Sequence, residues 1–388
     1  MDFCDIPINT SEIPQSDLNI DIKKRANLFS WNGQFSPQFV EAELNKYAHM
    51  DSVVIDPFAG SGTTLCEAAR KGLCAYGIEL NPSAYHMAKT YELVTLDFLE
   101  RNSLIMRIDE LLNSIKKDDE IISSLSNYIA TDENDNVRNV LSTLVILMDI
   151  FKNNVNIDLL NSKWEKLQNT IVELPYSTRP IVAINGDARE TSLASDTADI
   201  LLTSPPYINV FNYHQNYRRS VEVLGYDVLN IAKSEFGSNR KHRGNRFLTV
   251  IQYCIDMAMS FKEAIRICKK DARMIYVVGR ESTVLGYSFC NSELIYRIGT
   301  EIFKNGFDIR QERVFKNRYG QMIYEDILHF LNMKEGLISD EEIKSRAREI
   351  AVEMLFNRHR SMPENKNADT LLEAIKKADA VNTSEVVL

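Results

Sequence analysis

A rigid turn with unpaired carbonyl oxygens follows the apolar run 200–202, where the chain reads Thr203-Ser204-Pro205-Pro206-Tyr207. Two consecutive prolines fix two φ angles, remove two backbone donors and push Ser204 out of the helical region. The carbonyl oxygens of the turn therefore lack nearby amide partners, and the ring of Tyr207 stands beside them. This combination suits a planar ligand with an amino group, because the ring can stack on it and the oxygens can accept its hydrogen bonds.

A second candidate site is a glycine-containing turn between the apolar segment 53–55 and a helical pattern that begins near Thr63. Gly60 and Gly62 let the backbone approach a ligand closely, and the start of the following helix offers free N–H groups. The next apolar segment ends at Glu79, about twenty residues past the turn, where nucleotide-binding sheets hold ribose hydroxyls. The turn lacks the full spacing of a dinucleotide fingerprint, so a diphosphate ligand is not predicted.

Together these two motifs resemble those of the DNA amino-methyltransferases. Asp56-Pro57-Phe58-Ala59-Gly60-Ser61-Gly62-Thr63-Thr64 resembles the S-adenosylmethionine-binding motif of that family, and Ser204-Pro205-Pro206-Tyr207 resembles its catalytic motif. Segment 29–38 resembles the part that covers the methionine end of the cofactor, and segment 186–189 resembles the site where an Asp meets the adenine. Segments 305–307 and 325–330 resemble the closing β-hairpin of the same fold, so the resemblance covers roughly residues 25–95 and 180–332.

The resemblance implies the roles of individual residues. The catalytic residues are Ser204, Pro205, Pro206 and Tyr207, and the cofactor-binding residues are Phe35, Ser36, Asp56, Pro57, Phe58, Gly60, Gly62, Thr63, Glu79 and Asp187. Tyr207 is expected to stack on the target base, while the Ser204 hydroxyl and the Pro205 carbonyl accept hydrogen bonds from its amino group. Glu79 is expected to hold the ribose hydroxyls and Asp187 the adenine amino group. No metal is required.

The expected reaction is methyl transfer from S-adenosylmethionine to the exocyclic N4 of cytosine in duplex DNA, with the base flipped out of the helix. In the family, Ser before the two prolines is typical of cytosine-N4 enzymes, whereas Asp or Asn is typical of adenine-N6 enzymes. The cofactor motif precedes the catalytic one here, an order that differs from many cytosine-N4 enzymes. Adenine-N6 methylation, RNA amino-methylation and an inactive nucleic-acid-binding relative remain alternatives. A restriction–modification role would add a cognate restriction endonuclease as partner.

Composition narrows the function classes further. The 388 residues are 44% hydrophobic, which supports a buried core. Six scattered cysteines form no C-x-x-C pair, so no zinc or iron–sulfur framework is predicted. No Pro-Cys dipeptide occurs, which disfavours the covalent mechanism of cytosine-C5 methylation. The acidic start and the absence of a long apolar run predict a cytoplasmic protein without a membrane partner.

A DNA surface is predicted in the excursion 208–247, although the net charge of −9 argues mildly against phosphate contacts. Basic residues gather there among amides and aromatic rings, the residue types that clamp phosphates and read base edges. The predicted DNA-binding residues are Arg218, Arg219, Arg240, Lys241, Arg243 and Arg246.

The predicted fold is α/β: a Rossmann-like methyltransferase sandwich with a mainly parallel sheet, a closing antiparallel hairpin, a helical insertion and a helical C-terminal tail. The expected divisions are an N-terminal arm (1–24), the cofactor-binding half (25–98), the helical insertion (99–175), the catalytic half (176–335) and the C-terminal tail (336–388). Within the tail, Ser339 and Glu342 fit a capping box, and residues 382–388 are expected to fray.

Overall fold

The computed structural model describes residues 3–208, 213–237, 242–317, 320–335 and 338–387. Its centre is a seven-stranded sheet with the order β3-β2-β1-β4-β5-β9-β8. The strands of this sheet are β1 (Val53–Asp56), β2 (Cys74–Glu79), β3 (Ile181–Asn185), β4 (Ala198–Thr203), β5 (Cys268–Gly279), β8 (Gly306–Lys316) and β9 (Met322–Leu331). The first five run parallel, whereas β9 pairs antiparallel with β5 and with β8. The predicted mainly parallel sheet with a closing hairpin is confirmed.

Alternate residues of the central strands enter two separate cores, one on each face of the sheet. Val54 and Ile55 lie in different cores, and Leu202 and Leu201 are divided in the same way. Successive side chains of a strand point to opposite faces, so an uninterrupted apolar run supplies both cores. This explains the uninterrupted apolar runs at 53–55 in β1, 200–202 in β4 and 274–278 in β5.

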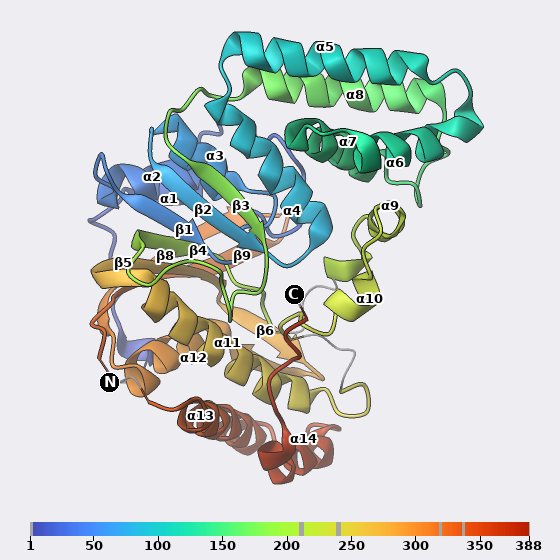
Figure 1. Cartoon of the computed structure of the whole chain (residues 1–388). Coiled ribbons are helices and arrows are strands. Elements are labelled where there is room, and N and C mark those ends of the chain that lie inside the picture. The colour runs from blue at the N-terminus through green and yellow to red at the C-terminus, as the bar shows by residue number, and fades with distance from the viewer. Residues whose placement is uncertain (1–2, 209–212, 238–241, 318–319, 336–337, 388) are drawn as a thin grey trace.

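Helices cover both faces of the sheet (Figure 1). One face carries α2 (Pro37–Tyr47), α3 (Thr63–Arg70) and α4 (Pro82–Lys89); the other carries α11 (Phe247–Ile267), α12 (Asn291–Arg297) and α13 (Asp340–Ser361). The remaining helices of the body are α1 (Gln15–Asn19), α9 (Arg218–Val223), α10 (Val228–Ile231) and α14 (Ala368–Lys376). A separate ribbon pairs β6 (Glu281–Val284) with β7 (Tyr287–Cys290). Short 3₁₀ helices are η1 (Phe3–Asp5), η2 (Thr90–Thr95), η3 (Asp118–Glu120), η4 (Tyr213–Gln215) and η6 (Ala378–Ala380), and η5 (Ile298–Ile302) is a π-helix.

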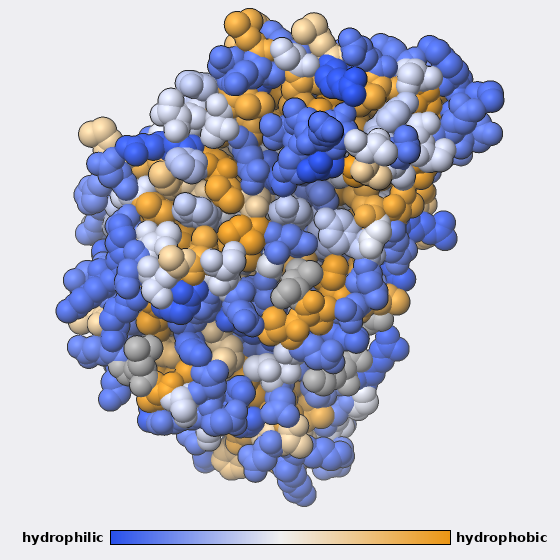
Figure 2. All heavy atoms as spheres, in the orientation of Figure 1, coloured by the Kyte–Doolittle hydropathy of each residue, from blue (hydrophilic) through white to orange (hydrophobic). Residues whose placement is uncertain are grey.

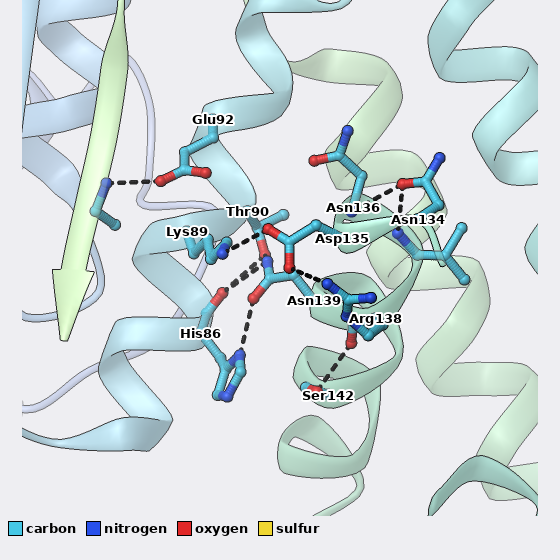
Figure 3. A network of polar contacts seen from close by, with 12 residues as sticks. His86, Lys89, Thr90, Glu92, Asn134, Asp135, Asn136, Arg138, Asn139 and Ser142 are labelled. Atoms are coloured by element: carbon cyan, nitrogen blue, oxygen red, sulfur yellow. Dashed lines mark hydrogen bonds and ion pairs between the residues drawn. The ribbon is translucent and has the colours of Figure 1, made fainter. Parts of the chain in front are cut away.

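Four helices form a layer at the top of Figure 1: α5 (Phe98–Ser114), α6 (Ile121–Thr131), α7 (Asp135–Met148) and α8 (Ile157–Glu173). A polar network joins α7 to α4 (Figure 3). Its main contacts are His86 Nδ1 to Asn139 Oδ1 at 2.8 Å and Lys89 Nζ to Asp135 Oδ2 at 2.7 Å. Burial lowers the pKa of His86 to about 4, so the ring is neutral near pH 7. The helical layer is thereby fixed to the helix that follows Glu79.

Among the described residues after α14, Ser384 is buried and hydrogen-bonded to the body, so the expectation of fraying is wrong at that position. Val381 is buried, and the Ser384 side chain lies in a buried hydrogen-bonded cluster. The chain end returns to the middle of the molecule beside α10 (Figure 1), where Glu385 pairs with Lys233 at 3.7 Å. Ser339 does cap α13, because its hydroxyl accepts a hydrogen bond from the Glu342 amide at 3.3 Å.

Hydrophilic residues spread over the face shown in Figure 2, with apolar residues in smaller groups between them. Among the described helices, none is long and apolar enough to cross a bilayer.

Candidate active site

The two predicted motifs meet at the carboxyl ends of β1 and β4, which are adjacent parallel strands. The chain leaves β1 toward β2 on one side and leaves β4 toward β5 on the other, and ligands of open α/β sheets bind where the strand order reverses in this way. Asp56 ends β1 and accepts hydrogen bonds from Thr64 Oγ1 and Thr203 Oγ1, both at 2.7 Å. Burial raises the pKa of Asp56 to about 6. The buried Asp56 carboxylate therefore connects the glycine turn to the proline turn by hydrogen bonds.

The glycine turn needs both of its glycines. Gly60 and Gly62 have φ angles of +54° and +89°, a region that other residues rarely adopt. A Cβ atom at Gly62 would also lie 2.7 Å from Tyr91 Cδ2 and 2.9 Å from Ala88 Cα. Close packing of helix α4 and the following turn against the glycine turn thus leaves no space for a side chain.

Glu79 is aimed at this turn, as the sequence predicts. Its Oε2 accepts a hydrogen bond from the Gly60 amide at 2.8 Å, and its Oε1 accepts one from the Asn81 amide at 2.7 Å. Burial raises the pKa of Glu79 to about 7 despite these hydrogen bonds. A carboxylate held by two amides in a half-buried site is well placed to accept hydrogen bonds from vicinal hydroxyls of a ligand.

A pocket opens beside the two turns, with about 980 Å³ of empty space when its open mouth is included. Residues of both motifs line it. The lining residues predicted from the sequence are Phe35, Pro57, Phe58, Gly60, Thr63, Glu79, Asp187, Ser204 and Pro206. The other predicted residues, Ser36, Asp56, Gly62, Pro205 and Tyr207, lie outside the lining. The structure therefore brings most of the cofactor group and part of the catalytic group together.

Segment 25–36 covers the glycine turn. Asn27 accepts a hydrogen bond from Thr63 Oγ1 at 3.3 Å and donates one to the Phe35 carbonyl at 2.8 Å. Gln34 accepts from Ser61 Oγ at 2.7 Å. The cover is thus attached to the turn by side-chain hydrogen bonds and places Phe35 in the pocket wall.

An aromatic stack that the sequence analysis missed closes the same side of the pocket. The Trp31 ring is nearly parallel to the rings of Tyr213 and Tyr217, with ring centroids 6.2 Å and 6.5 Å away and interplanar angles of 15° and 16°. The sequence assigned both tyrosines to a DNA surface, but Tyr213 lines the pocket. No local signal distinguishes the two placements, because an aromatic residue beside amides and arginines fits either one.

His214 and Glu235 add a polar pair to the same wall. The His214 amide donates to Glu235 Oε1 at 2.7 Å, and its Nδ1 lies 2.8 Å from Oε2. Beside them, the ring of Phe236 meets that of Phe58 edge-on at 5.3 Å. The excursion after the proline turn therefore builds one wall of the pocket, a role that its sequence did not reveal.

Asp187 lies in the lining, but its carboxylate is held by Arg189. Arg189 Nε donates to Oδ1 at 2.9 Å and Nη2 donates to Oδ2 at 2.6 Å, in a bidentate pair that is almost fully buried. The carboxylate orientation is thereby fixed, and only its remaining lone pairs are available to a ligand.

The proline turn is held by distant residues. The Pro206 carbonyl accepts a hydrogen bond from the Tyr253 hydroxyl at 2.7 Å, and the Tyr207 hydroxyl donates to Glu325 Oε1 at 3.2 Å. The Tyr207 ring lies against the Gly279 backbone, because a Cβ there would be 2.7 Å from Tyr207 Cε2. Burial raises the pKa of Tyr207 well above its usual value, which keeps the phenol protonated.

The predicted DNA-binding arginines do not form one cluster of free charges. Arg218 pairs with Glu222 at 2.7 Å, Arg219 lies over the ring of Phe151 at 5.2 Å, and Arg243 is exposed. Arg246 is half-buried at the start of α11. Arg240 and Lys241 lie outside the described residues.

Residues 11–90 match the DNA methylase family of the N6/N4 type. A curated relative, Type II methyltransferase M.MjaII of Methanocaldococcus jannaschii, is 30% identical over 105 residues, which are 26% of this chain. The matched part is 19% of that relative, so the chain spans about a fifth of its length.

Solved structures similar to this chain include a SAM-dependent methyltransferase from Methanosarcina mazei, with a TM-score of 0.37 and 13% identity over 75% of this chain and 97% of that one. Another is TrmN from Thermus thermophilus, with a TM-score of 0.33 and 13% identity over 79% of this chain and 50% of that one. At these scores the similarity carries no argument about function.

The matched segment contains the glycine turn and Glu79 but ends well before the proline turn at 204–207. The pocket's aromatic walls, glycine backbone and amide-held carboxylate fit a flat aromatic ligand that carries hydroxyl groups. The family match and the curated relative thus confirm the predicted resemblance to DNA amino-methyltransferases of the N4 and N6 type, and they support S-adenosylmethionine as the cofactor.

Proposed function

We propose that this chain transfers a methyl group from S-adenosylmethionine to the exocyclic N4 of cytosine in duplex DNA. One observation carries the proposal: Glu79 of the first motif and Ser204 of the second line the same pocket. Their turns are joined through Asp56 and Thr203, which are 147 residues apart in the chain. A cofactor held by the glycine turn would therefore lie beside a base held by the proline turn.

On the cofactor side, Glu79 holds the ribose hydroxyls, and the backbone around Phe58 and Gly60 contacts the ligand. Phe35 and the Trp31 ring lie toward the methionine end and exclude water from it. The bound cofactor supplies a methyl group that its sulfonium has already activated. The protein therefore contributes position and electrostatics and needs no nucleophile of its own.

On the substrate side, the proline turn offers acceptors for an amino group. Ser204 lines the pocket, and no described residue donates a hydrogen bond to the Pro205 carbonyl. The Pro206 carbonyl is already occupied by Tyr253. Hydrogen bonds from the cytosine amino group to Ser204 and Pro205 orient its nitrogen toward the methyl group and stabilise the positive charge that develops there. Reaching this position requires the base to leave the duplex, at a cost of a few kcal/mol.

The remaining assignments are part of the same proposal. Basic residues of the excursion, with exposed Arg219 and Arg243 among them, contact the DNA backbone, while the helical part at 99–175 serves as a packing subdomain. The domain boundaries predicted at residues 24, 98, 175 and 335 are part of the same proposal. A cognate restriction endonuclease would be the partner if the chain acts in a restriction–modification system.

Adenine N6 is the second candidate, because the family match includes both amino-methyltransferase types. Ser204 in front of the two prolines favours cytosine.

The test is transfer of labelled methyl from S-adenosylmethionine to duplex DNA, followed by nuclease digestion and mass identification of the modified nucleoside. N4-methylcytosine is the expected product. N6-methyladenine would keep the fold and the mechanism but overturn the inference from Ser204. Label in RNA, with none in DNA, would overturn the DNA assignment.

A further inference from the structure

The chain end is attached to the back of the pocket wall through buried polar contacts. The Ser384 amide donates to Asp256 Oδ1 at 2.9 Å, and the Ser384 hydroxyl donates to Oδ2 of the same carboxylate. Two residues before Ser384, the Asn382 carbonyl accepts a hydrogen bond from Gln252 Nε2 at 3.2 Å. The Val381 carbonyl accepts one from Arg348 Nε at 3.0 Å. Residues 381–385, called the tail segment below, are therefore bound along α11 and α13.

Arg189 connects the tail segment to the pocket, and it is buried, with a side-chain exposure of 3%. A guanidinium has five N–H donors. Nε and Nη2 donate to Asp187, and Nη1 donates to Asp256 at 2.8 Å. The two remaining donors reach main-chain oxygens of the tail segment, those of Ser384 and Glu385, both at 2.8 Å. Every donor of this buried cation is thus satisfied, two of them by the chain end.

The same guanidinium supports two residues of the pocket lining. It fixes the Asp187 carboxylate by the bidentate pair, and its carbon lies 5.0 Å from the ring centroid of Phe236. Phe236 in turn meets Phe58 of the glycine turn. A shift of Arg189 would therefore move an acceptor and an aromatic ring on the side of the pocket where the adenine is expected.

We propose that the tail segment is part of the cofactor site and that it positions, through Arg189, the wall that recognises the adenine of the cofactor. This rests on the proposed function, because it takes the pocket ligand to be S-adenosylmethionine. Ser384, Asp256 and Arg189 act as positioning residues: they touch Asp187 or one another, not the ligand. Without the tail, two donors of a buried cation lose their partners, and Arg189 leaves its position to regain hydrogen bonds with water.

The experiment compares ligand binding to the full chain and to a chain that ends at Thr383, by calorimetry with S-adenosylhomocysteine and its inosine analogue. The full chain is expected to prefer the adenine compound, because a correctly oriented Asp187 accepts a hydrogen bond from the 6-amino group. Truncation is expected to weaken binding of the adenine compound roughly tenfold and to reduce this preference, a change of about 1.4 kcal/mol. A general loss of stability would lower both affinities equally and leave the preference unchanged, which would overturn the proposal.

Point variants test the same proposal without removing the chain end, in case the truncated chain folds poorly. Arg189→Lys retains the charge but has three donors instead of five, so it is expected to lose the adenine preference. Asp379→Ala is the matched control, because Asp379 is exposed on the turn just before the tail segment. Wild-type affinity and preference in the Arg189→Lys variant would overturn the proposal. If the full chain binds neither compound, the proposed function itself fails and this inference fails with it.

Discussion

The glycine turn after β1 and the proline turn after β4 lie side by side, but different parts of the chain hold them. The glycine turn is fixed from nearby: Gly60 bonds to Glu79, 19 positions on, and Ser61 bonds to Gln34, 27 positions back. For the proline turn, Pro206 is held by Tyr253, 47 positions on, and Tyr207 by Glu325, 118 positions on.

This difference has a functional consequence. Changes in the glycine turn should act on cofactor binding, because its partners belong to the same cofactor-binding half. Changes in the proline turn, or in the closing hairpin behind it, should act on methyl transfer and leave cofactor binding intact. Among the described residues, Asp56 connects the two turns through Thr64 and Thr203.

The variant with the largest expected effect tests directly whether cofactor binding and methyl transfer depend on different turns. Tyr207→Ala removes the ring that packs against Gly279 beside the proline turn and that the family resemblance assigns to stacking on the flipped base. Stacking of a base on an aromatic side chain contributes about 1–3 kcal/mol. We expect the methyl-transfer rate to fall by a factor on the order of 100, while the affinity for S-adenosylhomocysteine changes less than about threefold. Single-turnover kinetics and calorimetry measure the two quantities.

Glu79→Ala is the matched opposite change and should weaken cofactor binding first. If both variants lose binding and transfer equally, the two turns are not functionally separate.

A backbone change should break the glycine turn without altering charge. Gly62→Ala forces a left-handed conformation and a collision with Tyr91 and Ala88, so we expect a loss of about 3 kcal/mol in the free energy of unfolding. Gly72→Ala is the control: Gly72 also has a positive φ of +65°, but nothing lies within 4 Å of its Cβ position. It should cost about 1 kcal/mol. Equal costs in denaturant titrations would show that packing at Gly62 is unimportant.

Behind the proline turn, Arg313 pairs with Glu325 at 3.3 Å and also faces the buried Glu43. Burial raises the pKa of Glu43 to about 8, above its ordinary value near 4.5. Glu43 is therefore neutral in the folded chain and charged in the unfolded chain between these pH values, so it costs stability as the pH rises from about 5 to 8.

Glu43→Gln removes this cost. We expect the variant to match the wild type at pH 5 and to exceed its free energy of unfolding by on the order of 2 kcal/mol at pH 8. Chemical denaturation at the two pH values checks this. A variant that is less stable than the wild type at pH 8 would mean that Glu43 is ionised and paired there.

The smallest effect concerns the hydrogen bond between Tyr207 and Glu325. Glu325→Gln keeps the shape but weakens a hydrogen bond to a charged acceptor, so the methyl-transfer rate should fall by roughly tenfold. Cofactor affinity should stay the same, because Glu325 lies outside the pocket lining. Glu281→Gln, at an exposed position, is the control. A change in cofactor affinity without a change in rate would reverse the assignment of the hairpin to the proline turn.

The sequence by itself determined the local features of this protein. The apolar runs predicted the parallel strands, the glycines predicted a turn whose backbone can approach a ligand closely, and Glu79 was predicted at the end of the next strand. Ser339 was predicted as a helix cap. Each of these depends on backbone preferences and side-chain spacing within a few residues, which the sequence states directly.

Only the tertiary structure decided which distant residues complete the site. It placed Tyr213 in the pocket lining, laid Tyr207 against Gly279, and brought Ser384 to Arg189, 195 positions away. Such contacts form only when loops of many residues close and both cores pack, so no local pattern encodes them. The chain end shows this most clearly, because its terminal position predicts fraying while two buried charged residues, Arg189 and Asp256, hold it in place.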